Sequence, residues 1–214
     1  YVYGQQKMIA QFNCTGDWAF YIEGDEVYHE QDLEKIKKSM ELNLNDANVE
    51  ALVFDFHHFY GNAVSVLDSP GWYRSEARII KNSVRSYAPD GLFWLILDSN
   101  KKGRYPRAKR TGVACYHYGW VRSEKQMNLK SSKVQKYWGK EPVAIDYSKM
   151  DQSIIKEFKG SHPKIVQDWL PKETGLYMAD SDYEPSAKQK KHRIMLKLED
   201  LFGLELSKKH FKLV

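Results

Sequence analysis

Apolar runs alternate along the chain with stretches of helical spacing, which predicts a fold built from both strands and helices. Residues 18–22 form an apolar and aromatic run that stops at the acidic tetrapeptide of residues 23–26, as a buried strand stops at a sheet edge. Residues 49–60 alternate between an apolar face and a mixed face, which is typical of a strand. Apolar runs at 92–97 and 113–120 predict two more strands.

Helical spacing follows the first strand and dominates the last third of the chain. Asp32 is a candidate cap for a helix in which Leu33, Ile36 and Met40 share one face. Ser123 followed by Gln126 has the form of a capping box. Further helices are predicted at residues 151–158, at 164–170 and at 188–202, the last ended by a glycine. The pattern of residues 72–82 fits either a strand or a helix, and the basic stretch 101–110 indicates a surface loop.

Composition places the chain among globular proteins. It has 214 residues, of which 42% are hydrophobic and 29% charged, enough for one or two domains with a sizeable core. The net charge of +5 suits an anionic ligand but falls short of a dedicated nucleic-acid binder. Cys14 and Cys115 are too few for a disulfide framework, and no membrane span or signal-peptide pattern is present. We therefore expect a cytoplasmic protein without a transmembrane segment.

The acidic tetrapeptide is the sharpest chemical feature. In an extended chain, Glu23 and Asp25 project to the same side, where two carboxylates can share one hard cation. Mg²⁺ and Mn²⁺ prefer oxygen ligands and keep positions for water or phosphate, so the pair predicts half of a metal and diphosphate site. The alternative interpretation is an acidic turn exposed to solvent.

Histidines among aromatic residues are the second feature. His117 lies in an aromatic run and could complete a metal shell or contact a phosphate. A hydrogen-bonded histidine of the core is the alternative. The same two interpretations apply to His57 and His58, where the wall of an aromatic pocket competes with a catalytic role.

Five sequence blocks in a fixed order resemble glycosyltransferase family 2, in particular a bacterial-type subgroup. In the first block the acidic tetrapeptide is followed by Val27-Tyr28-His29-Glu30. The blocks together cover residues 15–30, 54–61, 72–82, 117–122 and 158–163. Each block alone is weak, but their common order makes the resemblance fairly specific.

The resemblance implies an α/β fold of GT-A type, a Rossmann-like mixed sheet flanked by helices. Residues 1–122 would form a partial catalytic domain with the metal and acceptor side, and residues 123–214 a helical carboxyl-terminal extension. The nucleotide-binding portion of the family, with its early aspartate, would precede Tyr1.

The resemblance also implies roles for individual residues. It places a divalent cation, Mn²⁺ or Mg²⁺, at two residues, Asp25 and His117. The residues expected to bind the donor are Glu23, Glu26, Arg74, Arg78 and Arg122. The residues expected on the acceptor side are His57, His58 and Trp72. The catalytic base would be Asp90 or Glu76, with a slight preference for Asp90, because Glu76 could instead pair with Arg74 or Arg78.

The resemblance implies transfer of a sugar from a nucleotide-sugar donor to a hydroxyl of a glycan, glycolipid or protein acceptor, with inversion and with a divalent metal. One alternative is a non-catalytic module that binds carbohydrate or a partner, suggested by the missing portion and by an aromatic content of 14%. A phosphate or nucleic-acid binder using residues 101–110 is a third possibility, which a solvated basic surface explains equally well, so no nucleic-acid partner is expected.

Overall fold

The computed structural model describes residues 2–137, 141, 144–170, 172 and 175–214. The chain divides into two compact units that alternate along the sequence. Unit 1 contains Tyr1–Phe56, Ser75–Cys115 and Lys209–Val214, and unit 2 contains His57–Arg74 and Tyr116–Lys208. Two long strands, β3 (Ala51–Tyr60) and β9 (Arg107–Trp120), contribute residues to both units.

Unit 1 is built on a mixed sheet. β5 (Ser75–Lys81) pairs antiparallel with β1 (Trp18–Phe20) on one side and with β3 on the other. β9 pairs with β3, with β2 (Glu26–Tyr28) and, in parallel, with β11 (Lys212–Leu213) near the carboxyl terminus. The strand β5 is therefore central, and all seven of its residues are buried.

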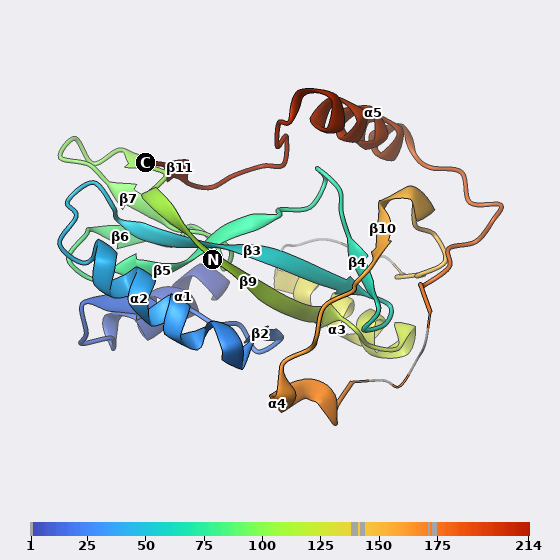
Figure 1. The fold of residues 1–214 in the computed structure, drawn as a ribbon, viewed down its shortest axis with the longest axis horizontal. Coiled ribbons are helices and arrows are strands. Elements are labelled where there is room, and N and C mark those ends of the chain that lie inside the picture. The colour runs from blue at the N-terminus through green and yellow to red at the C-terminus, as the bar shows by residue number, and fades with distance from the viewer. Residues whose placement is uncertain (1, 138–140, 142–143, 171, 173–174) are drawn as a thin grey trace. The chain divides into compact units, whose positions relative to one another are not determined.

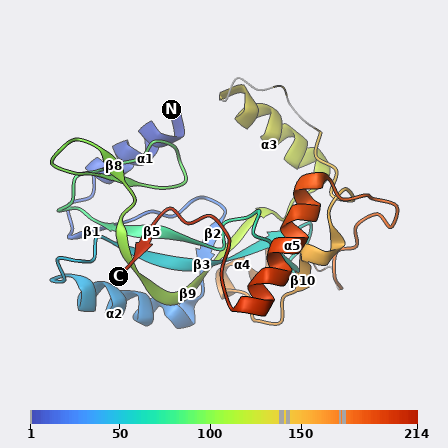
Figure 2. The ribbon, with the colours of Figure 1, turned by 90° about the horizontal axis from the view of Figure 1, so that it is seen from above.

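Helices flank this sheet, as Figure 2 shows with α1 (Val2–Phe12) and α2 (Leu33–Asn43) on opposite sides of β5 and β3. The short helix η1 (Glu30–Asp32) leads into α2. Small residues of the sheet pack with larger ones from outside it in a core that includes Trp94, Ile96 and Phe211. The chain is thus a mixed α/β protein, as the sequence predicts at that level.

Unit 2 surrounds a second core with short strands and helices (Figure 1). β4 (Ser65–Leu67) pairs antiparallel with β10 (Ile155–Glu157) and, through one residue, with the end of β3. The helices are α3 (Glu124–Tyr137), η2 (Gln152–Ile154), α4 (Lys164–Gln167) and α5 (Ala187–Phe202). Buried aromatic residues such as Tyr60 and Tyr147 join them.

Several predicted elements are confirmed where local signals are strong. Helix α2 begins directly after Asp32, although that side chain makes no capping hydrogen bond. The capping box at the start of α3 is present, because Gln126 N–H donates to Ser123 Oγ and Ser123 N–H donates to Gln126 Oε1. Helix α5 ends at Gly203, which has the left-handed φ of 63° that favours glycine.

Residues 72–82, whose pattern fits either a strand or a helix, contain the strand β5. Three other predicted elements differ from the structure. The apolar run 92–97 contributes β7 (Leu95–Leu97) to a separate sheet with β6 (Ser86–Tyr87) and β8 (Gly103–Arg104), so it is not a strand of the main sheet. Residues 151–158 form η2 and β10 instead of an α-helix, because β4 supplies an edge with which residues 155–157 pair.

The basic stretch 101–110 is largely extended rather than a loop. β8 lies within it, and β9 begins at Arg107. Distant carboxylates pair with its cations: Arg104 Nη2 lies 2.6 Å from Glu50 Oε1, and Lys109 Nζ lies 3.2 Å from Asp46 Oδ2. These ion pairs hold basic side chains against unit 1 and compensate part of their charge.

Two larger expectations stay predictions. The mixed sheet and its helices do not by themselves establish a GT-A fold. The predicted domain boundary between residues 122 and 123 likewise stays a prediction. Among the described residues, no helix combines the length and the apolar composition that crossing a membrane requires.

Candidate functional site

The acidic tetrapeptide forms a tight turn between β1 and β2. Glu26 N–H donates to the Glu23 carbonyl oxygen at 3.0 Å, and Glu23 N–H donates back to Glu26 Oε2 at 3.2 Å. The expectation that Glu23 and Asp25 share one face of an extended strand is therefore wrong, since β1 already ends at Phe20. Gly24 and half-buried Asp25 form the tip, and a Cβ placed on Gly24 would meet no atom within 4 Å.

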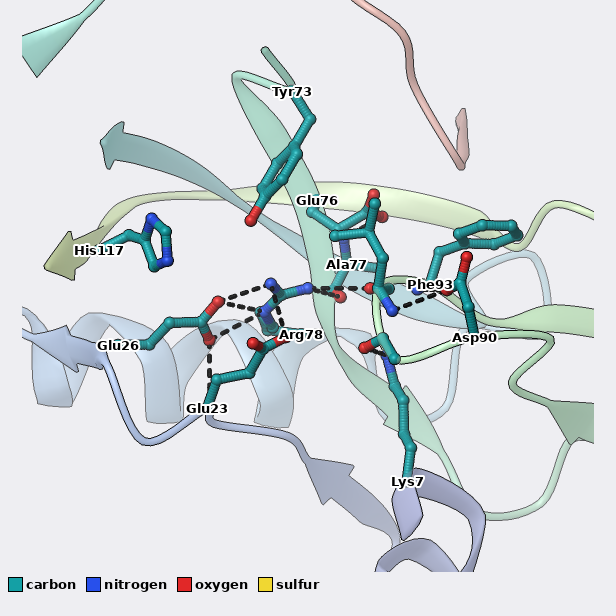
Figure 3. A network of polar contacts seen from close by, with 12 residues as sticks. Lys7, Glu23, Glu26, Tyr73, Glu76, Ala77, Arg78, Asp90, Phe93 and His117 are labelled. Carbon is teal, nitrogen blue, oxygen red and sulfur yellow. Dashed lines mark hydrogen bonds and ion pairs between the residues drawn. The ribbon is translucent and has the colours of Figure 1, made fainter. Parts of the chain in front are cut away.

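Arg78 of β5 holds this turn from the interior. Figure 3 shows its guanidinium reaching the carboxylates of Glu26 and Glu23. The distance from Arg78 Nη2 to Glu26 Oε1 is 2.6 Å, and Nε lies 3.0 Å from Glu26 Oε2, whereas Glu23 Oε1 is 3.6 Å from Nη2. The side chains of Arg78 and Glu26 are both completely buried, so this bidentate ion pair holds the turn rigidly against the interior of unit 1.

The guanidinium of Arg78 has further partners on its other sides. Nη1 donates to the Leu92 carbonyl at 3.1 Å, and the ring of Phe56 lies 4.9 Å from the guanidinium carbon. Burial raises the pKa of Glu23, against the opposing pull of Arg78. The turn thus presents carboxylates in a partly desolvated setting, where a cation would bind more strongly than on an open surface.

Lys7 of α1 lies in the same region of unit 1. Its Nζ stands 3.6 Å from the ring centroid of Trp94 and 4.3 Å from that of Tyr21, and it donates to the Gly91 carbonyl. Burial, reinforced by repulsion from Arg78, lowers the pKa of Lys7 to about 7. This lysine is therefore close to its titration point at neutral pH.

The two candidate bases have different surroundings. Glu76 is fully buried, and its Oε2 lies 2.6 Å from His210 Nδ1, while Oε1 accepts the N–H of Ala77. Neither Arg74 nor Arg78 is the ion-pair partner of Glu76 in the described structure; the ion pair found there is with His210. Asp90 is only half-buried, and its Oδ1 accepts the N–H of Leu92 at 2.7 Å, which shapes the turn at that point.

In unit 2, His58 and His117 form a direct pair. Their Nδ1 atoms lie 2.9 Å apart, and His58 Nε2 lies 2.7 Å from the Tyr73 carbonyl oxygen. Because a carbonyl oxygen can only accept a hydrogen bond, neutral His58 carries its proton on Nε2. Its Nδ1 then accepts a hydrogen bond from the Nδ1–H of His117. His117 is therefore hydrogen-bonded, as the core interpretation expects, while being only half-buried.

The other residues predicted on the acceptor side fall into two groups of contacting rings in unit 2. The half-buried ring of His57 lies 5.2 Å from the rings of Tyr116 and Phe158. Trp72 packs with ring centroids 5.6 Å from both His58 and Trp120. His58, Trp72 and His117 therefore share one group of contacting rings, whereas His57, the neighbour of His58 on β3, contacts the rings of the other group.

The three arginines expected at the donor have three different settings. Arg78 is buried among carboxylates of unit 1. In unit 2, Arg74 pairs with Asp68 at 2.6 Å and with Glu199 at 2.7 Å. Arg122 is exposed and lines a pocket of about 480 Å³ in unit 2. Arg122 is thus the member of this set that faces a space large enough for a small ligand.

The residues present fit a weakly held divalent cation better than a closed metal centre. Across the part of the chain that the structure describes, no group of three or more histidine, cysteine, aspartate and glutamate side chains is arranged to hold a metal ion. Mg²⁺ and Mn²⁺ can be held by one or two carboxylates when phosphate oxygens and water supply the rest. The turn offers Asp25 and Glu23 for this purpose, whereas His117 belongs to the other unit, and its role as a ligand stays a prediction.

Two residues of unit 1, Lys7 and His210, could not be identified as important from the sequence patterns. Lys7 resembles any surface lysine of an amphipathic helix, and only Trp94 and Tyr21, distant in sequence, bury it. His210 lies near the carboxyl terminus, with no local signal that links it to Glu76.

Comparison of the chain with protein-family models finds no match, and comparison with curated proteins finds none either. The functional argument therefore depends on the residues themselves.

Proposed function

We propose that the chain is the metal and acceptor side of a glycosyltransferase that resembles family 2. It would move a sugar from a nucleotide-sugar donor to a hydroxyl group of a glycan, glycolipid or protein, with inversion and with a divalent cation.

One observation carries this proposal: a buried arginine fixes the acidic turn, at whose tip Gly24 is exposed and Asp25 half-buried. Arg78 engages Glu26 with two short hydrogen bonds, and this engagement orients the turn that contains Asp25. The buried carboxylate of Glu26 needs this counter-charge, and the pair in turn holds the adjoining Gly24 and Asp25 in one geometry. Rigid support of this kind is what a binding site for a cation and a diphosphate needs.

The chemistry assigns separate tasks to the residues of unit 1. A divalent cation, when bound, offsets the charge that develops on the departing nucleoside diphosphate. Asp25 and Glu23 would hold that cation, and Arg78 acts as a positioning residue through Glu26. Asp90 is the preferred base, because Glu76 is enclosed with His210 and is not accessible to an acceptor hydroxyl.

A non-catalytic carbohydrate-binding module is the second candidate. It is favoured by the pocket of unit 2, which combines Arg122 with the aromatic side chains of Trp169 and Tyr177. Such a module would bind sugar without metal and without dependence on Asp25.

The test is a screen of nucleotide-sugar donors for release of nucleoside diphosphate, with and without Mn²⁺. Metal-dependent release by the whole chain supports the enzyme. Release from no donor, together with metal-independent sugar binding, would favour the module.

A further inference from the structure

The pocket beside Arg122 has features of a ligand site that are independent of the acidic turn. Its volume of about 480 Å³ lies within the range of small-molecule sites. Its walls come from segments far apart in sequence, all within unit 2: Gly61, Val121, Arg122, Ser123, Gln126, Tyr147, Trp169 and Tyr177. A pocket assembled from so many segments has a defined shape rather than being the surface of one loop.

Arg122 differs from most arginines of the chain. Six of the other seven form ion pairs with carboxylates: Arg74, Arg78, Arg104, Arg107, Arg110 and Arg193. Arg122 is exposed, and no ion pair to it is found within the described residues. The amino-terminal end of α3 adjoins it at Ser123, and the partial positive charge of a helix start favours an anion there. Arg122 therefore places a positive charge at the pocket, where a negative group could pair with it.

Aromatic side chains supply the other half of the site. Trp169 is 54% exposed, although its edge contacts the ring of Tyr118 with centroids 6.0 Å apart. A large ring kept in water at the rim of a pocket is suited to stack on an apolar ligand face. Gln126 adds a primary amide whose Oε1 accepts Ser123 N–H, so its Nε2 is the donor end toward a ligand.

The remaining walls are rigid. Tyr177 packs its ring so tightly on Gly61 that a Cβ there would lie 2.5 Å from ring carbon Cδ2. The Tyr177 N–H donates to Ser65 Oγ at 2.6 Å, and the hydroxyl of Tyr147 donates to the Trp120 carbonyl at 3.0 Å. Preformed walls reduce the entropic cost of binding.

We infer that this pocket binds a pyranose sugar that carries an anionic substituent, either a carboxylate or a phosphate. The sugar ring would stack on Trp169, and the guanidinium of Arg122 would pair with the anion. This assigns Arg122 to an anionic sugar rather than to the diphosphate of the donor. That the sugar belongs to the acceptor rests on the proposed function, whereas binding itself does not.

The test is calorimetric titration of the whole chain, without metal or donor, with four probes. Methyl glucuronide and glucose 6-phosphate represent the two anionic sources, and methyl glucoside and inorganic phosphate separate the ring from the charge. We expect an anionic sugar to bind at least about tenfold more tightly than either control probe. Arg122→Gln and Trp169→Ala should each weaken it about tenfold or more, while Arg85→Gln, an exposed arginine of unit 1, should not.

Both substituted residues are exposed, so the variants should fold, which circular dichroism will verify. The inference is overturned if neither anionic sugar binds, if inorganic phosphate binds as tightly as glucose 6-phosphate, or if both variants bind like the parent. Sugar binding without any donor turnover would reject the proposed function and keep this inference. Donor turnover without binding of either anionic sugar would do the reverse.

Discussion

Arg78 donates to both carboxylate oxygens of Glu26, with Nη2 to Oε1 at 2.6 Å and Nε to Oε2 at 3.0 Å, and both side chains are shielded from solvent. Such a pair costs desolvation when it forms and costs more when one partner is removed. It therefore locks the acidic turn in one geometry. This is how a residue on the central strand β5 determines where Asp25 lies.

Removing one partner of this pair should destabilise the protein strongly. Glu26→Ala leaves the guanidinium of Arg78 buried without its main counter-charge, and we expect a loss of about 3 to 5 kcal/mol in the free energy of unfolding. Urea denaturation measures this. The exposed Glu41→Ala, as control, should change it by no more than about 0.5 kcal/mol. If both substitutions lower the free energy of unfolding by the same small amount, the Arg78–Glu26 pair does not stabilise the fold.

Lys7 should make stability depend on pH. Its pKa is lowered to about 7 in the folded chain from an ordinary value of 10.5, so between these values the unfolded state binds more protons. Stability should therefore rise with pH from about 7 to about 10.5, by at most about 1.4 kcal/mol per pH unit from this group. Below pH 7 the unfavourable burial of the charge is fully present.

Lys7→Met should remove that rise and stabilise the protein at pH 6, whereas Lys38→Met, at an exposed position, should do neither. Urea denaturation of the parent and both variants at pH 6, 8 and 10 compares the slopes. The prediction is wrong if the parent and Lys7→Met share the same slope between pH 7 and pH 10.

His210 should anchor the carboxyl-terminal segment to unit 1. Its ring stacks on Phe93 with centroids 4.2 Å apart, and its Nδ1 contacts the buried carboxylate of Glu76. His210→Ala leaves Glu76 without this partner and should cost about 3 kcal/mol in unfolding experiments. His210→Gln, which can still donate a hydrogen bond, should lose less. Lys208→Ala, at an exposed site nearby, is the control, and a cost no larger than that of the control would refute the anchor.

Gly61 and Gly203 allow strain and steric clash to be separated. Both have positive φ, 71° and 63°, but a Cβ on Gly61 would collide with the ring of Tyr177, whereas one on Gly203 would meet nothing within 4 Å. Gly203→Ala should therefore cost about 1 kcal/mol from backbone strain alone. Gly61→Ala should cost clearly more and weaken binding in the Arg122 pocket. Thermal unfolding compares the two, and equal losses would mean that Tyr177 moves aside freely.

Local signals in the sequence were sufficient for some elements. The capping box of Ser123 and Gln126 and the αL glycine at 203 depend on neighbours a few residues away, so α3 and α5 could be predicted. The apolar sequence of β3 is also a local signal, although eight of its ten residues are buried and the burial does not alternate. In contrast, cations of the basic stretch 101–110 pair with Glu50, Asp46 and Asp55, which lie more than 50 residues earlier.

The site shows the same limit. The acidic tetrapeptide could be singled out from the sequence, but its geometry could not, because the chain turns through a hydrogen bond from Glu26 N–H to the Glu23 carbonyl where a strand was expected. The partnership of Arg78 with Glu26 joins two strands, and that of Glu76 with His210 spans 134 residues. Neither contact can be predicted from the spacing of neighbouring residues along the sequence. Roles for Asp90 and His117 in catalysis stay predictions.

Binding of Mn²⁺ at the acidic turn tests the central claim most directly. Electron paramagnetic resonance counts bound Mn²⁺ in the presence of a nucleoside diphosphate, for the parent chain, Asp25→Asn and the exposed control Asp17→Asn. Each substitution removes one negative charge and little volume. We expect the diphosphate to promote Mn²⁺ binding in the parent and in Asp17→Asn, and Asp25→Asn to lose it at least about tenfold. Equal Mn²⁺ affinity in all three proteins would contradict the account.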